Sequence, residues 1–205
     1  MSKPITTTLN EIRKHGPCKD GWEILLKHLG GTKADFNAAI DLLTILDING
    51  LVDCLWCARA THGHDRLWRL YAVWCARQVQ HLMTDDRSIA ALDVAERFAN
   101  GNATAAELAE AQEAARAAEI AARAAEIAAS AYSDSAIDIA IASAAAADVL
   151  EPNAYHAALD TATSAAEVTA WATEIAASAD AWADAWAVQE VKLRQILTAG
   201  EWVDE

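Results

Sequence analysis

One heptad occurs twice in the middle of the chain: Ala114-Ala-Arg-Ala-Ala-Glu-Ile120 is followed directly by the same seven residues at 121–127. Seven residues are close to two turns of an α-helix, so equivalent positions of the two copies fall on one side of a helix. The two isoleucines would therefore lie on one line, and Glu119 would pair with Arg123 four residues later. The repeat predicts a helix.

The composition around the repeat makes helix the expected structure for the whole second half of the chain. Of 50 alanines in 205 residues, 39 follow residue 100. No glycine lies between Asn102 and Ala199, and Pro152 is the only proline there. Alanine is the best helix former, whereas glycine and proline break helices. The segment therefore has few ways to form anything else.

The first long helix is expected to begin at Thr104, because Thr104-Ala-Ala-Glu107 has the spacing of a capping box. Continued without a break to Leu150, it would be about 70 Å long at 1.5 Å per residue. Polar residues of lower helix propensity interrupt the alanines at Ser130, Ser133, Asp134 and Ser135. A kink or a turn at these residues is the alternative.

A second long helix is expected after Glu151-Pro152, because proline disfavours helical angles in the preceding residue and itself fits a first helical turn. At 100° per residue, its large apolar side chains fall within a sector of about 60°. They are Val168, Trp171, Ile175, Trp182, Trp186 and Leu193. This stripe either packs on the alanine-rich helix or the first half of the chain, or leaves indoles exposed for a partner.

The first half of the chain is expected to form several shorter helices that end at glycines. These helices are expected at residues 8–16, 20–30, 35–47, 51–60, 64–83 and 85–101. The sequence therefore predicts an all-α protein, in which a bundle of short helices is followed by long Ala-rich antiparallel helices. We expect two parts, a short-helix module at 1–101 and an acidic Ala-rich long-helix region at 102–205 that packs with it.

The formal net charge of −14 lies in the second half, which has 18 acidic and 4 basic residues against 12 of each in the first 100 residues. Nucleic acids and anionic membranes are polyanions, so this charge disfavours direct binding to either. Residues 1–8 contain no apolar signal segment, and the most apolar stretch, at 137–147, is too short to span a bilayer. We therefore expect a cytoplasmic protein.

The four cysteines are expected to be reduced thiols in the core rather than disulfides. Cys54 and Cys57, followed by His62 and His64, are the best candidates for a metal site. Thiolates three residues apart share a helix side, and a short turn can bring an imidazole to the same ion. The spacing matches no zinc module, and both cysteines lie in an apolar run, so we expect core packing and no metal.

The sequence lacks the common motifs of catalysis. It contains no Gly-x-Ser-x-Gly, no phosphate-binding glycine loop and no His-Glu-x-x-His. We therefore expect no enzymatic activity and no cofactor.

The run from Arg66 to Ser88, continued by 91–108 and then by alanine-rich heptads, resembles an uncharacterised family of bacterial and phage proteins. In that family a short helical module precedes an alanine-rich helical tail of variable length. The segments 8–13, 17–22, 44–51 and 55–57 are similar to its phage-borne branch. The resemblance covers nearly the whole chain and implies an all-helical protein. It implies no activity and no functional residues.

We therefore expect a phage-type protein in the host cytoplasm that acts by binding another protein. It would inhibit or modulate a host or defence protein, as an anti-CRISPR or anti-restriction protein does. The candidate partner-binding residues are indoles and carboxylates of the second half. They are Trp171, Trp182, Trp186, Glu167, Glu174, Asp180 and Asp184.

Two alternatives stay open. An acidic nucleic-acid mimic would occupy a basic groove, although 18 acids along two helices of about 70 Å give about one per 4 Å, against one charge per about 1.7 Å in duplex DNA. A self-assembling helical rod would instead recruit a second copy through the alanine-isoleucine seam and form a homodimer.

Overall fold

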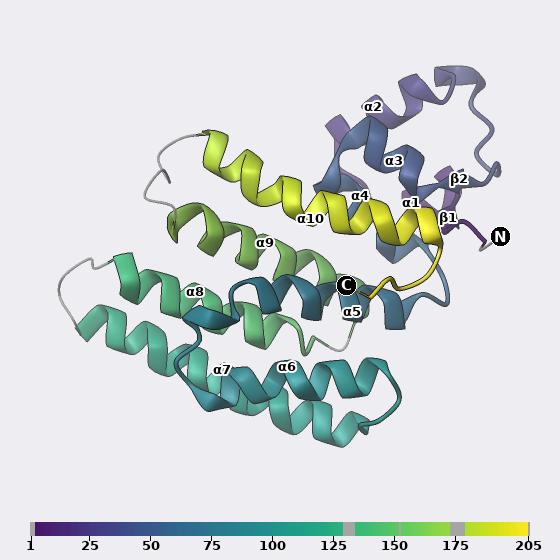
Figure 1. Ribbon diagram of the computed structural model, residues 1–205. Helices are drawn as coiled ribbons and strands as arrows, with labels where there is room; N and C mark the ends of the chain where they lie inside the picture. The colour runs from purple at the N-terminus through teal and green to yellow at the C-terminus, as the bar shows by residue number, and fades with distance from the viewer. Residues whose placement is uncertain (1–2, 129–133, 152, 173–178, 205) are drawn as a thin grey trace. The chain divides into compact units, whose positions relative to one another are not determined.

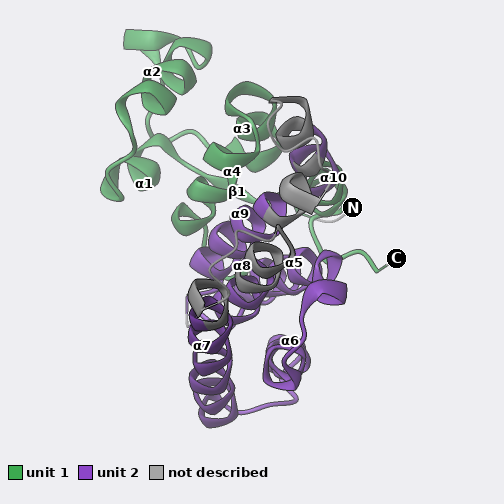
Figure 2. Cartoon of the chain, turned by 90° about the vertical axis from the view of Figure 1, so that its left-hand side faces the viewer, with its two compact units in different colours: residues 1–64, 190–205 green, residues 65–189 purple. Residues whose placement is uncertain are grey.

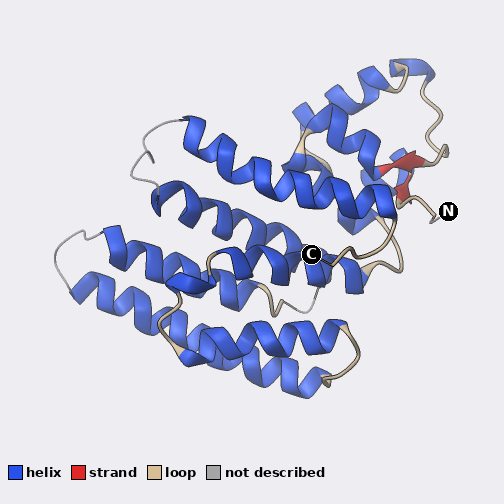
Figure 3. Ribbon diagram, in the orientation of Figure 1, coloured by secondary structure: helices blue, strands red, loops and turns tan. Residues whose placement is uncertain are grey.

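The computed structural model describes residues 3–128, 134–151, 153–172 and 179–204 (Figure 1). Within these ranges it leaves out the side chains of 125–128, 134–140, 168–172, 179–183 and 185. The described residues form ten α-helices and one two-stranded sheet (Figure 3). The predicted all-α class is confirmed, with short helices followed by longer alanine-rich antiparallel ones.

The chain divides into two compact units (Figure 2). Unit 1 consists of residues 1–64 and 190–205, and unit 2 of residues 65–189. Each unit combines residues from both sides of position 101. The boundaries of the compact units therefore differ from the boundary in composition near residue 101. The net charge belongs to unit 2, which has 19 acidic and 7 basic residues, whereas unit 1 has 11 and 9.

Unit 1 contains a small sheet, four short helices and the last part of α10. Its elements are β1 (Thr6–Thr7), α1 (Leu9–Lys14), α2 (Lys19–His28), β2 (Ile40–Asp41), α3 (Leu42–Asn49) and α4 (Leu51–Cys57), with α10 (Ala179–Ala199) entering it at Glu190. The two strands pair antiparallel, with Thr6 opposite Asp41. Fully buried aliphatic side chains form its core, among them Ile5, Leu9, Ile12, Leu42, Ile45 and Leu55.

Side-chain caps begin three of these helices. The Thr8 hydroxyl accepts a hydrogen bond from the Glu11 amide at 3.1 Å, as the first predicted cap requires. Asp41 caps α3 by accepting from the Leu43 amide at 2.9 Å. The Cys18 sulfur accepts from the Gly21 amide at 3.4 Å at the start of α2. Local polar contacts therefore set where the chain turns into helix.

The helix predicted at 35–47 is wrong over residues 35–41 and correct from Leu42 onward. Residues 40 and 41 form β2 instead, and α3 begins at Leu42 and continues to Asn49. The strand pairs with β1, more than thirty residues earlier, so the extended conformation of residues 40 and 41 depends on a distant contact. Gly50 then separates α3 from α4 at a φ of 82°, a left-handed conformation that glycine adopts without strain.

Unit 2 contains five helices and the first part of α10. They are α5 (Asp65–Gln78), α6 (Asp86–Ala99), α7 (Ala105–Ala128), α8 (Asp134–Asp148) and α9 (Ala154–Ala172). Successive helices from α6 to α9 pack on one another, and α5 packs on both α6 and α9 (Figure 1). Short connections make these neighbours antiparallel.

Alanines form much of the buried surface of α8 and α9. Ala142, Ala145, Ala146, Ala157, Ala158, Ala162 and Ala166 are fully buried. Small side chains let helix axes approach to about 8 Å. Gln189, 3% exposed, connects the first part of α10 to this layer, because its Nε2 donates to the Ala162 carbonyl at 2.9 Å.

Neither of the two long uninterrupted helices is observed. The first is divided into α7 and α8, which pack on each other, and the division falls between Ala128 and Asp134. Ser130 and Ser133, where a turn was the alternative, lie outside the described residues. The second is divided into α9 and α10, so the apolar stripe from Val168 to Leu193 does not lie on one helix.

The local contacts predicted around the heptads are confirmed. Thr104 and Glu107 form both hydrogen bonds of a capping box, at 3.2 and 2.8 Å. Glu119 and Arg123 form an ion pair at 3.0 Å. Ile120 is 68% exposed.

None of the helices in the described part of the chain is long and apolar enough to cross a bilayer.

Candidate ligand pocket

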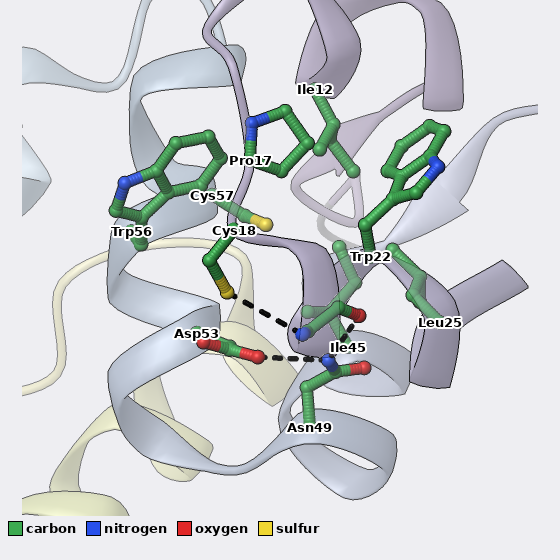
Figure 4. A pocket seen from close by; sticks show the side chains of 11 residues that line it. Ile12, Pro17, Cys18, Trp22, Leu25, Ile45, Asn49, Asp53, Trp56 and Cys57 are labelled. Carbon is green, nitrogen blue, oxygen red and sulfur yellow. Dashed lines mark hydrogen bonds between the residues drawn. The ribbon is translucent and has the colours of Figure 1, made fainter.

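A pocket of about 410 Å³, including its opening to solvent, lies among α1, α2, α3 and α4 of unit 1 (Figure 4). Most of its lining is apolar, from Ile12, Pro17, Trp22, Leu25, Ile45 and Trp56. Its polar groups come from Cys18, Gly21, Asn49, Asp53 and Cys57. A mostly apolar lining with a few polar groups is typical of ligand sites.

Asn49 joins the pocket's polar groups. Its Nδ2 donates to the Gly21 carbonyl at 2.9 Å and to Asp53 Oδ2 at 2.8 Å (Figure 4). Asn49 Oδ1 is buried without a hydrogen-bond partner among the described residues. The amide therefore holds the Asp53 carboxylate against α2.

The absence of a side chain at Gly21 leaves space for the Asp53 carboxylate. A Cβ at residue 21 would overlap the Asp53 carboxylate and lie 3.2 Å from the Cys18 sulfur. Gly21 is inside a helix, where glycine costs about 1 kcal/mol relative to alanine. The missing side chain thus makes room for the carboxylate.

Two half-buried indoles flank the pocket. Figure 4 shows Trp22 and Trp56 on opposite sides, with Pro17 and Cys18 between them. Trp22 meets Phe36 edge to face at 6.0 Å, and the Arg59 guanidinium lies 4.5 Å from the centre of the Trp56 ring. Val52, one turn before Trp56 on α4, is 50% exposed.

The buried thiols are poor nucleophiles. Burial, together with the nearby Asp53, raises the pKa of Cys57 to about 12. Burial likewise raises the pKa of Cys54 well above its usual value, and the Cys54 thiol donates to the Leu42 carbonyl at 3.4 Å. Both therefore remain protonated at neutral pH, whereas a cysteine nucleophile is a thiolate.

The candidate metal ligands are not brought together. His62 is exposed and its Nε2 lies 3.9 Å from Glu11, while Cys54 and Cys57 are buried and His64 is half-buried. In the part of the chain that the structure describes, no three His, Cys, Asp or Glu side chains are placed to hold a metal ion.

The predicted partner-binding residues stay a prediction. Asp184 is exposed, and Glu167 and Trp186 are half-buried. Glu174 and the side chains of Trp171, Asp180 and Trp182 lie outside the described residues.

Sequence reasoning missed the pocket. The available signals were Asp53, an acid inside the apolar run at 51–58, and Gly21 inside an amphipathic helix. Neither residue by itself indicates that it contacts the other, because Gly21 and Asp53 lie on helices far apart in the chain.

Comparisons with models of protein families, with curated proteins and with solved structures found no match to this chain.

Proposed function

We propose that this protein is an interaction module that inhibits or modulates another protein by binding it. The observation that carries the proposal is the pocket of unit 1, flanked by the half-buried indoles of Trp22 and Trp56. Indoles contribute large contact areas and are frequent in binding hot spots. The pocket thus offers apolar surface and one carboxylate, which suits recognition.

The finer proposal is that the partner is a host or defence protein, as for an anti-CRISPR or anti-restriction protein. This part rests on the resemblance of the segments 8–13, 17–22, 44–51 and 55–57 to phage-borne sequences.

Affinity capture tests the binding proposal. The tagged chain is expected to retain a specific protein from a bacterial lysate, identified by mass spectrometry. Trp56→Ala should lose that protein, because the substitution removes one wall of the pocket. Ile120→Ala, which removes an exposed apolar side chain from unit 2, is the matched control and should retain it. Retention by Trp56→Ala at an unchanged melting temperature would contradict the proposal.

An acidic mimic is the second candidate, favoured by the exposed carboxylates of α7. Glu107, Glu110 and Glu113 recur every three residues and all are exposed. Binding to a basic groove through them should weaken steeply between 50 and 300 mM salt, with a log-log slope of several units. A contact through the apolar pocket should change little over that range, so a salt series on the captured complex separates the two candidates.

A further inference from the structure

We propose that the pocket of unit 1 binds an arginine side chain of the partner protein, with the guanidinium at Asp53 and its aliphatic stem along the apolar lining that Trp22 and Trp56 flank. This inference rests on the proposed function, and it names the chemistry of the group that enters the pocket.

The first argument is the state of Asp53. Its carboxylate is half-buried among apolar side chains, and it accepts a hydrogen bond from the neutral amide of Asn49. Among the described residues it has no ion-pair partner, whereas other acids of unit 1 do, Glu11 with Lys14 and Glu190 with Arg194. A carboxylate withdrawn from water is stabilised by a cation. Arg59 lies over the Trp56 ring, and no cation among the described residues forms an ion pair with Asp53, so a cationic ligand can supply that pair.

The second argument is that this carboxylate is held in place. Asn49 fixes Oδ2, and the missing side chain of Gly21 lets the carboxylate lie against α2. Both amide hydrogens of Asn49 are already donated, to Gly21 and Asp53. Asn49 and Asp53 can therefore only accept hydrogen bonds from a ligand. A ligand group that donates hydrogen bonds is the one that fits.

The third argument is the combination of indoles and charge. Cations bind favourably over indole faces, and guanidinium groups also stack on them. The Trp56 ring already carries one such contact, from Arg59, whose Nε donates to the Trp56 carbonyl. Pro17, which is half-buried and also lines the pocket, adds apolar surface suited to a methylene stem. A guanidinium is preferred to an ammonium because it can also pair with the carboxylate in a bidentate manner.

Titration of the full chain with n-butylguanidinium tests the inference, with the isosteric but neutral n-butylurea as the control probe. The indole N–H resonances of Trp22 and Trp56 are followed by nuclear magnetic resonance and assigned with the variants Trp22→Phe and Trp56→Phe. Butylguanidinium should shift both resonances to saturation and bind about tenfold more tightly than butylurea.

Asp53→Asn should weaken butylguanidinium binding about tenfold and leave butylurea binding unchanged. The matched control is Asp20→Asn, which removes the same charge from an exposed position of α2 outside the pocket, and it should bind both probes as the unmodified chain does. If Asp53→Asn does not fold, the comparison of the two probes on the unmodified chain still decides.

Equal affinity for butylguanidinium and butylurea, or unmoved Trp22 and Trp56 resonances, would overturn the inference. Tighter binding of n-butylammonium than of butylguanidinium would overturn the choice of arginine. These outcomes leave partner capture unaffected, and failure of capture leaves the probe titration unaffected, so the two proposals fail separately.

Discussion

At the scale of single residues, the position of Asp53 depends on a glycine in another helix. The carboxylate occupies the space that a Cβ of Gly21 would fill. Glycine inside a helix is unfavourable by about 1 kcal/mol relative to alanine, so α2 gives up helix stability to accommodate the acid.

Gly21→Ala should therefore destabilise the protein by about 1 kcal/mol or more, because displacing Asp53 breaks its hydrogen bond to Asn49 and outweighs the gain in helix propensity. In an Asp53→Ala background the same substitution should stabilise by about 1 kcal/mol. Chemical denaturation of the four proteins measures the difference. A stabilising Gly21→Ala in the unmodified chain would show that Asp53 does not need this space.

A second residue-scale prediction concerns Asp148, the last residue of α8. Burial, together with the nearby acids Asp160, Glu119 and Glu151, raises its pKa from 3.8 to about 6, against the opposing hydrogen bond from Ser164. The folded chain thus holds the proton more tightly than the unfolded chain does. The free energy of unfolding should therefore fall as the pH rises from about 4 to about 6.

Asp148→Asn should remove this fall and stabilise the protein at pH 7 by roughly 2 kcal/mol, after allowance for solvent near the half-buried group. Unfolding curves between pH 4 and 8 provide the measurement. Glu113→Gln, a neutralised acid on the exposed side of α7, is the control and should keep the fall. A pH dependence that survives Asp148→Asn would mean that other carboxyl groups cause it.

At the scale of elements, α5 is connected to its neighbours by a buried arginine. Arg69 is 3% exposed, its Nη1 donates to the Val149 carbonyl at 3.1 Å, and its guanidinium lies 5.2 Å from the centre of the Phe98 ring. Burial lowers the pKa of Arg69. One side chain thus joins α5 to the chain just after α8 and to α6.

Arg69→Ala should destabilise unit 2 by about 3 kcal/mol, because it removes buried packing and leaves the Val149 carbonyl without this donor. Arg66→Ala is the matched control: Arg66 is exposed and bonds Asn100 at 2.8 Å, so its loss should cost less than about 1 kcal/mol. Denaturation midpoints of the two variants decide the question. Equal losses would show that burial of Arg69 adds nothing to stability.

At the scale of the whole molecule, the charge is divided unequally between the units. Unit 2 has 12 more acidic than basic residues and unit 1 has 2 more. Repulsion among like charges destabilises a compact state, and salt screens it.

Raising sodium chloride from 10 to 300 mM should therefore slow amide hydrogen exchange in unit 2, by an amount equivalent to about 1 kcal/mol, and change unit 1 much less. Mass spectrometry of peptides from each unit resolves the two effects, and choline chloride at the same concentration controls for specific binding of sodium. An equal change in both units would show that self-repulsion does not limit unit 2.

The helical class and the local contacts could be predicted from sequence because they depend on residues within about four positions. The Thr8 cap, the Thr104 capping box and the Glu119–Arg123 ion pair belong to this kind. Helix propensity and turn chemistry act at the same short range. These features follow from the amino-acid sequence alone.

Tertiary structure alone decided the strand before α3, the two compact units and the pocket. The strand before α3 forms because Ile40 pairs with Thr7, and the polar corner of the pocket forms because Asn49 meets Gly21, 28 residues away. Such meetings depend on how several helices bury their side chains together. The periodicity of a single helix does not indicate which distant residue will pack against it. The residues around Asp53 are therefore set only when the chain is folded.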